Sequence, residues 1–263
     1  QGRLASAGTK HYTYRPAPRL CAIRQAHFQR RTQIQAHSSN TDNRRARSEA
    51  TKNALMRAAE QLIAERGIEN VSIRDIVSAA NQKNESVLQY HFKNLTGLIE
   101  AIQLTRSKQT HQRRAELIEA LSSKTTEPSI REICMLLVQP SFELACENTD
   151  YDCYIKAFGH ELILTDTSPA ELAASHGGGG ISGKQASSML RIALPHLDST
   201  AYQHRLDAAV MLCSTSMYHQ ARQKNAFSGD QAELFLHSLV DALVGLFSAA
   251  VSPQTQALSD KLK

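Results

Sequence analysis

Apolar positions recur at helical spacing along most of the chain after residue 50. Residues 51–67, "TKNALMRAAEQLIAERG", carry their leucines, isoleucine and central alanines on one face, and Gly67 is positioned to end the helix. Residues 72–92, "SIRDIVSAANQKNESVLQYHF", predict two short helices joined by a polar turn at residues 81–84. Together these segments predict a three-helix unit of roughly 45 residues, which is too small to be stable by itself.

The two short helices carry the local signals of helix starts. Ser72 can cap the first of them, and the Asp75 carboxylate three residues later can cap back. Asn84 can cap the second, with Glu85 in a first turn where the helix dipole favours negative charge. We therefore expect both helices to form, despite their short lengths.

The second short helix has an outward face that core packing does not explain. Leu88 and Phe92 lie four residues apart and form its apolar face. Helical geometry then turns small, polar and aromatic side chains outward. These are Ser86, Val87 and Tyr90, flanked by Glu85, Gln89 and His91. Such a face is suited to enter a groove.

A fourth, longer helix is predicted to follow the three-helix unit. Asn94 can cap it, and its sequence "LTGLIEAIQLTRSKQTHQRRAELIEAL" covers residues 95–121. Its middle, from Arg106 to Arg114, is rich in charged residues, which is typical of a helix partly in solvent. We expect this helix to link two bodies.

Beyond Pro128 the pattern predicts a series of apolar helices, and the whole chain is predicted to be all-α with about nine helices. These helices are expected near residues 128–148, 150–165, 184–194, 200–224 and 230–250. The glycine-rich segment 175–184 is predicted to be a flexible loop. A phosphate cradle there is disfavoured, because no strand precedes it and it lacks the GK[ST] ending of a P-loop.

The last two helices have wide apolar stripes, which are typical of a core or of a subunit interface. We expect a dimer interface there. Its candidate residues are Met211, Leu234, Leu239, Leu243 and Phe247.

The net charge of +5 is unevenly distributed. Residues 1–47 contain ten Lys and Arg against one acid, whereas residues 48–263 contain twenty against twenty-four. The first segment also lacks apolar periodicity, so it is predicted to be a basic, disordered extension. Its Arg-rich, acid-poor composition is typical of an organellar transit peptide as well. The rest of the chain is divided into the three-helix unit at 48–93, a second helical domain at 94–251 and a C-terminal tail at 252–263.

Composition favours a cytoplasmic protein. No uncharged apolar run approaches the roughly 18 residues needed to span a bilayer. The five cysteines are an odd number without a CxxC pair, so they are interpreted as reduced thiols. The histidines are scattered without ligand spacing. No metal, cofactor or catalytic residue is expected, although catalytic groups need not be close in sequence.

Residues 58–102, "AAEQLIAERGIENVSIRDIVSAANQKNESVLQYHFKNLTGLIEAI", resemble the DNA-binding head of the TetR family of bacterial transcriptional regulators. The resemblance is carried by "AERG" at the end of the first helix, "VSIRDIV" at the start of the first short helix and "YHF" at the end of the second short helix. It is specific from Thr51 to Ile102 and only architectural from there to about Val251.

The resemblance implies a helix-turn-helix head, a helical domain with an effector pocket, and a homodimer on a palindromic operator. It places the protein in the bacterial cytoplasm, associated with the nucleoid. The expected DNA-binding residues are Arg44, Arg45, Arg47, Ser72, Arg74, Asn84, Glu85, Ser86, Val87, Gln89, Tyr90, His91 and Lys93. Among these, Glu85, Ser86 and Val87 match base-reading positions, and Gln89, Tyr90 and His91 match phosphate-binding positions.

Two features depart from a simple DNA-binding surface. The Lys that commonly contacts phosphate at the start of the family's fourth helix is Leu95 here, with Lys93 as a substitute. The head is also electrically balanced, with six basic and six acidic residues between 48 and 93. A basic arm of Arg44, Arg45 and Arg47, directly before the first helix, is therefore expected to add affinity.

The effector is expected to be a small, apolar or amphipathic molecule held between helices of the larger domain. Its expected contacts are Cys134, Met135, Phe142, Tyr151, Tyr154, Phe158, His160 and Met189. The main hypothesis is a repressor released from its operator by this molecule. The alternatives are a constitutive DNA-binding regulator without an effector and a helical enzyme with a vestigial helix-turn-helix.

Overall fold

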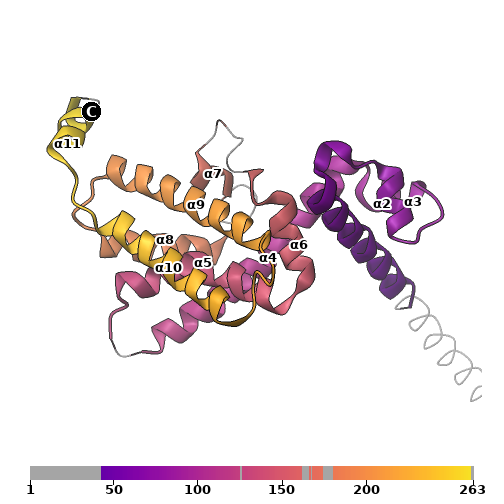
Figure 1. Ribbon diagram of the computed structural model, residues 1–263, viewed down its shortest axis with the longest axis horizontal. Helices are drawn as coiled ribbons and strands as arrows, with labels where there is room; N and C mark the ends of the chain where they lie inside the picture. Colours follow the sequence, from indigo (N-terminus) through magenta and orange to yellow (C-terminus); the bar gives the residue numbers. More distant parts are fainter. Residues whose placement is uncertain (1–42, 125, 162–165, 167, 174–179, 262–263) are drawn as a thin grey trace, which may run out of the picture. The chain divides into compact units, whose positions relative to one another are not determined.

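The computed structural model describes residues 43–124, 126–161, 166, 168–173 and 180–261. Throughout these residues the regular elements are helices and no strand occurs, which confirms the predicted all-helical fold (Figure 1). The chain divides into two compact units, residues 1–51 and 52–263.

Within the first unit only residues 43–51 are described, and they are helical. The three arginines of the expected basic arm are exposed there. This corrects one expectation: Arg44, Arg45 and Arg47 lie in helical structure and do not precede it. The rest of the predicted extension, residues 1–42, lies outside the described residues.

The second unit begins with the three-helix head. Residues 52–66 are helical, and Gly67 ends that helix with a φ of 77°, a left-handed conformation that suits glycine. The next elements are the 3-10 turn η1 (Ile68–Asn70) and the helices α2 (Ile73–Ala79) and α3 (Ser86–Phe92). Their apolar faces meet in one buried cluster, as the sequence pattern predicts. Its fully buried members are Leu55, Ala59, Ile76, Leu88, Leu98 and Ile102.

The long helix α4 (Leu95–Ser122) starts at a tight turn after α3. The Asn94 side chain caps it by accepting a hydrogen bond from the Gly97 nitrogen at 2.8 Å. A Cβ atom at Gly97 would lie 2.1 Å from the Phe92 carbonyl oxygen, so only glycine fits this turn.

The middle of α4 is buried on one face only. Arg106, Ser107, Thr110 and Arg114 are all less than a tenth exposed. They recur at helical spacing, so α4 turns a polar stripe inward. Lys108 and Gln112 are exposed, so the helix is partly in solvent, as the sequence predicts.

Helices α5 to α11 form the remainder of the second unit. Their bounds are α5 Ile130–Glu147, α6 Thr149–Phe158, α7 Pro169–Ala173, α8 Ile181–Ala193, α9 Ser199–Ala221, α10 Gly229–Ser248 and α11 Pro253–Lys261. The five helices predicted beyond Pro128 are present, but α6 ends at Phe158 and not near residue 165. Helix α8 begins inside the predicted glycine loop, whose residues 175–179 lie outside the described part. The short elements η1, α7 and α11 were not predicted.

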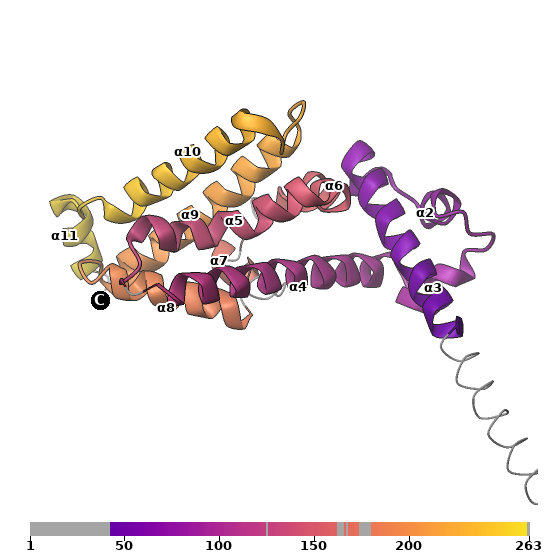
Figure 2. The ribbon, with the colours of Figure 1, turned by 90° about the horizontal axis from the view of Figure 1, so that it is seen from below.

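These helices pack around α5, which contacts α4, α6, α8, α9 and α10 (Figure 2). The sequence of α5 is largely apolar, which suits this central position, and Ser129 and Glu132 form a capping box at its start. Phe142 of α5 packs against Phe227 and Phe235, with ring centroids 5.9 and 6.5 Å away. Helices α9 and α10 complete the same hydrophobic core.

Proline inside α5 has a consequence for α4. Pro140 has no N–H to donate to the Leu136 carbonyl four residues earlier. That carbonyl instead accepts a hydrogen bond from Arg114 Nε at 3.0 Å. The proline therefore creates the acceptor that holds a buried arginine of the neighbouring helix.

Across the described part of the chain, no single helix is long and apolar enough to cross a membrane. Helices α10 and α11 meet the length and composition criteria only as a pair, bent by 62°. Helix α10 buries Leu236, Val240 and Phe247 in the core.

Candidate nucleic-acid interface and ligand cavity

The start of α2 is fixed by the predicted capping box. The Asp75 nitrogen donates to Ser72 Oγ at 3.2 Å, and the Ser72 nitrogen donates to Asp75 Oδ2 at 3.0 Å. The hydrogen bonds from the Ser72 hydroxyl and nitrogen lower the pKa of the Asp75 carboxyl. At the start of α3, Asn84 Oδ1 accepts from the Ser86 nitrogen at 2.9 Å. Local side chains thus position both helices of the helix-turn-helix.

Most of the expected DNA-binding residues of the head are exposed, on α3 and on the segments around it. Tyr90 is 81% exposed, which is unusual for an aromatic side chain in a protein without a partner. The other exposed members are Ser72, Arg74, Asn84, Glu85, Ser86, Gln89 and Lys93. Two are half-buried: Val87 packs on the head core, and the His91 ring makes an edge contact with Tyr90. DNA contact by this set remains a prediction.

The junction between α3 and α4 contains Leu95, which replaces the usual lysine, and Lys93, its expected substitute. Lys93 is exposed and has a φ of 69°, in the left-handed region that a lysine rarely adopts. Leu95 packs against the head core. At the position where the family commonly has a phosphate-binding lysine, this chain has an apolar contact.

A buried ion pair joins the head to α4. Arg106 Nε and Nη2 donate to the two Glu60 carboxylate oxygens at 2.7 and 2.6 Å, and both side chains are buried. Burial raises the pKa of the Glu60 carboxyl, and the hydrogen bonds from Arg106 oppose that shift. Burial alone would lower the pKa of Arg106, but Glu60 raises it. This bidentate geometry keeps the pair together.

Helix α6 also contributes to the head. Its residues Ala157 and Phe158 are buried in the head's hydrophobic cluster, and Tyr154 packs against that cluster and against the body core. An exposed contact between Arg57 and Asp150, 3.8 Å apart, lies nearby. Through α6, the packing of the head depends on the position of a helix of the larger domain.

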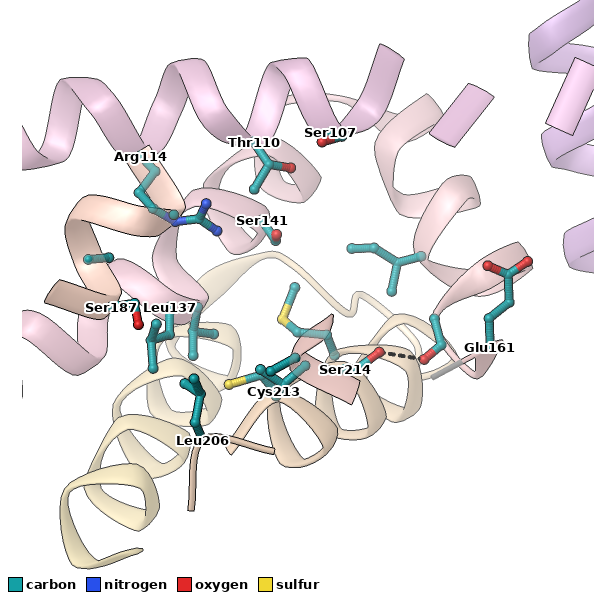
Figure 3. Close-up of a pocket in the computed structure, with 18 of the residues that line it drawn as sticks. Ser107, Thr110, Arg114, Leu137, Ser141, Glu161, Ser187, Leu206, Cys213 and Ser214 are labelled. Carbon is teal, nitrogen blue, oxygen red and sulfur yellow. Dashed lines mark hydrogen bonds between the residues drawn. The ribbon is translucent and has the colours of Figure 1, made fainter. Parts of the chain in front are cut away.

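The larger domain contains a cavity of about 530 Å³ between α4, α5, α6, α8 and α9 (Figure 3). This size falls in the range that accommodates a drug-sized organic molecule. Most of its wall is apolar. The apolar lining includes Leu137, Val138, Ile155, Phe158, Leu206, Val210 and Met217.

Helix α4 contributes Ser107, Thr110 and Arg114 to the polar part of the cavity wall, and the other helices contribute further polar side chains. Thr110 Oγ1 lies 2.6 Å from the Tyr151 hydroxyl and 3.0 Å from the Arg106 carbonyl oxygen. The Tyr151 hydroxyl is also 3.3 Å from Ser141 Oγ. Ser107 Oγ is buried and makes no hydrogen bond with any described residue. A hydroxyl network therefore connects the cavity to the turn of α4 that holds Arg106.

Two ionisable side chains mark different ends of the cavity in Figure 3. Burial lowers the pKa of Arg114, whose guanidinium lies in the wall. Burial raises the pKa of Glu161, whose carboxylate accepts from Gln103 Nε2 at 2.8 Å. Burial also raises the pKa of Tyr154, so this hydroxyl stays protonated.

Three of the eight expected effector contacts line this cavity: Tyr151, Tyr154 and Phe158. The other five are corrected. Four of these belong to the body core, because their helices turn them away from the cavity: Cys134, Met135, Phe142 and Met189. His160 packs against Tyr218 with ring centroids 5.3 Å apart and is absent from the cavity wall.

The expected dimer-interface residues separate into two groups. Leu234 is 58% exposed and Met211 39% exposed, so both can meet a second chain. Leu239, Leu243 and Phe247 are buried in the core of this chain, on the inner face of α10. This corrects the expected interface, and dimerisation itself remains a prediction.

A serine–histidine contact occurs between α8 and α4 but is not arranged for catalysis. Ser182 Oγ lies 3.0 Å from His111 Nδ1 and also donates to the His111 carbonyl oxygen at 3.1 Å. Ser182 is only 4% exposed and does not line the cavity. This geometry ties the first turn of α8 to α4.

Residues 55–102 match the family model described as "Bacterial regulatory proteins, tetR family". A comparison with curated protein sequences found no match. Solved structures similar to this chain include three that share under 20% identity with it.

Salmonella enterica GusR is 17% identical, covers 76% of this chain and 96% of its own, and has a TM-score of 0.48. A tetR-family transcriptional regulator from Streptomyces coelicolor is 17% identical, covers 81% of this chain and 88% of its own, and has a TM-score of 0.49. Thermus thermophilus FadR, in complex with lauroyl-CoA, is 19% identical, with coverage of 77% and 97% and a TM-score of 0.46.

The helix-turn-helix and its exposed α3 have the arrangement expected of a DNA-binding head. Residues 55–102 carry the amino-terminal domain of the TetR family, which confirms the resemblance seen in the sequence.

Proposed function

We propose that this protein is a repressor that leaves its operator when a small organic molecule binds in the cavity. The observation that carries this proposal is the double role of α6. Phe158 is buried in the head's hydrophobic cluster and also lines the cavity. A molecule that moves this side chain must change the packing of the DNA-binding head, because close-packed cores do not deform continuously.

The polar contacts of α4 supply a second route between cavity and head. Tyr151 contacts Thr110, which bonds to the Arg106 carbonyl, and Arg106 binds Glu60 of the head. A ligand that displaces the Tyr151 hydroxyl would act on the same turn of α4 that holds the head. It must prefer the conformation with low DNA affinity, since equal affinity for both conformations would shift nothing.

The operator is proposed to be palindromic and to bind a homodimer. The exposed Leu234 and Met211 are available to a second copy of the chain. Two heads in a dimer would read half-sites about one helical turn apart, roughly 34–36 Å, or a multiple of that distance. A monomer by light scattering at micromolar concentration would contradict this arrangement.

The cavity favours this function over constitutive DNA binding, for which a solidly packed larger domain would be expected. Operator footprinting with and without a metabolite library tests the proposal. We expect protection of a palindromic site that disappears with a subset of the compounds. Protection that no compound changes would support the constitutive regulator, and failure to protect any DNA would contradict both functions.

Operator DNA and the effector should also affect one another equally. If the effector lowers the DNA affinity by a given factor, DNA must lower the effector affinity by the same factor. Titration of a releasing compound into the free protein and into the DNA complex measures this reciprocity.

A further inference from the structure

We propose that the cavity binds an amphipathic organic acid, whose carboxylate is held by Arg114 with the Ser107 hydroxyl as a second donor. This inference rests on the proposed function in one respect, because it takes the cavity to be the effector site. It adds the chemical class of the effector and the residues that select it.

Arg114 is oriented for this contact by its neighbours. Its Nε donates to the Leu136 carbonyl that Pro140 leaves without a helical partner. This bond fixes the plane of the guanidinium, and its terminal nitrogens project into the cavity in Figure 3. A planar guanidinium binds a carboxylate through two parallel hydrogen bonds, which an alcohol cannot accept in the same way.

The two buried arginines of α4 differ in their electrostatics. Glu60 raises the pKa of Arg106, whereas burial lowers the pKa of Arg114. Burial therefore makes the charged form of Arg114 less favourable than it is in water. An anion beside it would favour that charged form, and the low dielectric of the cavity would strengthen the attraction.

Ser107 is an independent indication of a ligand. It lies on the same face of α4 as Thr110 and Arg114, three and seven residues before them along the chain. Ser107 is 8% exposed and lines the cavity, and its hydroxyl has no partner among the described residues. Burying an unsatisfied hydroxyl is unfavourable, so a ligand oxygen at this position would gain affinity.

The remaining wall explains why the acid is amphipathic. Away from α4 the cavity is lined largely by apolar side chains of α5, α6 and α9, such as Val138, Ile155 and Leu206. An apolar body can fill that space while the carboxylate stays at Arg114. Glu161 lies at a different end of the cavity and offers a competing anchor, which would select a cation instead. The exposed side chains of Glu171 and Lys184 also line the cavity.

The experiment compares head groups on identical bodies. The full chain, without DNA, is titrated calorimetrically with 4-phenylbutyrate, 4-phenylbutanol and 4-phenylbutylamine, and with decanoate, decanol and decylamine. We expect at least one acid to bind about tenfold or more tightly than its matched alcohol, because the alcohol cannot accept a hydrogen bond as a charged group. The amines should bind more weakly still.

Variants assign the preference to residues. Arg114→Met should remove the affinity advantage of the acid over the alcohol. Ser107→Ala should weaken binding of the acid several-fold. Arg113→Met is the matched control, because Arg113 is adjacent on α4 but pairs with Glu143 and Glu147 outside the cavity. It should leave the acid's affinity unchanged. If Arg114→Met does not fold, Arg114→Lys keeps the charge and removes the planar fork, and should lose most of the preference.

Equal binding of acids and alcohols, no binding by any acid, or unchanged acid binding without the Arg114 guanidinium would overturn the inference. Preference for the amines would assign the anchor to Glu161 instead and would also overturn it. Release of operator DNA is measured separately. Acid binding that depends on Arg114 but leaves the DNA bound would contradict only the proposed repressor function. Release of DNA by neutral compounds alone would contradict only the proposal that the effector is an acid.

Discussion

The recognition helix and the cavity place their polar groups in opposite ways. On α3 the polar residues are consecutive in sequence and exposed, and Tyr90 extends into solvent beside them. In the cavity, Ser107, Ser141 and Ser187 come from three helices that are distant in the chain. The first surface depends on local structure, and the second forms only when the larger domain has folded.

This difference predicts different responses to substitution. An exposed residue of α3 can be changed with little effect on folding, because its side chain packs against little of the core. Buried polar residues of α4 affect stability and ligand binding together, since they lose solvation when the protein folds. The Glu60–Arg106 pair connects the head to α4, the helix that contributes Ser107 and Arg114 to the cavity wall, so it offers the strongest test of how independent the two regions are.

Arg106→Met should have the largest effect. It leaves the Glu60 carboxylate buried without its two hydrogen bonds, which costs about 3–5 kcal/mol of unfolding free energy. Glu60 and Arg106 replaced together by Leu and Met should recover most of that stability. Arg57→Met is the control, because its exposed contact with Asp150 should contribute only about 0–1 kcal/mol. Denaturant unfolding measures the free energy of unfolding of the parent protein and of the three variants.

The destabilisation in Arg106→Met should also depend on pH. The pKa of Glu60 is raised in the folded protein, so its stabilising contribution is present at low pH and is lost as the pH rises through that pKa. Without Arg106 the pKa should rise further. The deficit of the variant should therefore shrink as the pH falls below 7, because the carboxyl becomes protonated. A deficit that grows on acidification would contradict a buried, destabilised carboxylate.

A second pair of variants compares the packed head with the hollow domain. Ala59 is fully buried in the head core, so Ala59→Phe should overpack it and cost about 1–3 kcal/mol or more. Val210 lines the cavity, so Val210→Phe has space available and should cost less than about 1 kcal/mol. Val210→Phe should also weaken any cavity ligand. Equal destabilisation by both variants would show that the cavity is not available in solution.

The contrast also explains what the sequence could predict. Ser72, Asp75 and Asn94 act on residues within three positions of themselves, so capping and helix starts were predicted correctly. The family match to residues 55–102 confirms the helix-turn-helix on the same local pattern. The base and phosphate contacts stay predictions, because they require DNA.

The cavity was predicted less well, because its polar wall depends on which helix faces α4. The charged run from Arg106 to Arg114 predicts a helix partly in solvent, and only tertiary packing decides that Arg106 and Arg114 turn inward while Lys108 is exposed. One signal was present: Pro140 interrupts the hydrogen bonding of a helical segment and requires a donor from elsewhere. The sequence alone does not identify that donor as Arg114, 26 positions earlier.

The α3 surface should be separable into reading and positioning residues. Ser86→Ala or Glu85→Gln should change the preferred operator sequence, at a cost of about 1–3 kcal/mol on the best site. Val87 is a less suitable probe, because it is half-buried against the head core. His91→Ala or Lys93→Ala should weaken binding to all DNA sequences alike and lower the salt dependence of that binding. Selection from a randomised operator pool would show whether His91 changes base preference, which would reverse the two roles.

The smallest effect per residue is expected from the arginines of the first unit. Arg44, Arg45 and Arg47 are exposed on helical residues, and we expect their side chains to contact phosphates. Replacing all three with Gln should weaken every DNA sequence equally and leave the unfolding midpoint unchanged. The slope of log K against log salt should fall by about 0.9 for each phosphate that the variant no longer neutralises.

Deleting residues 1–42 should weaken DNA binding less than this triple replacement, because distant charges are screened within about 10 Å at moderate salt. Fluorescence anisotropy over a salt series measures the DNA affinity of the triple replacement and of the deletion variant, each compared with the full chain. An equal decrease in affinity from the replacement and the deletion would show that the whole basic segment engages DNA, since charges far from the head would then count as much as the three arginines closest to it in sequence.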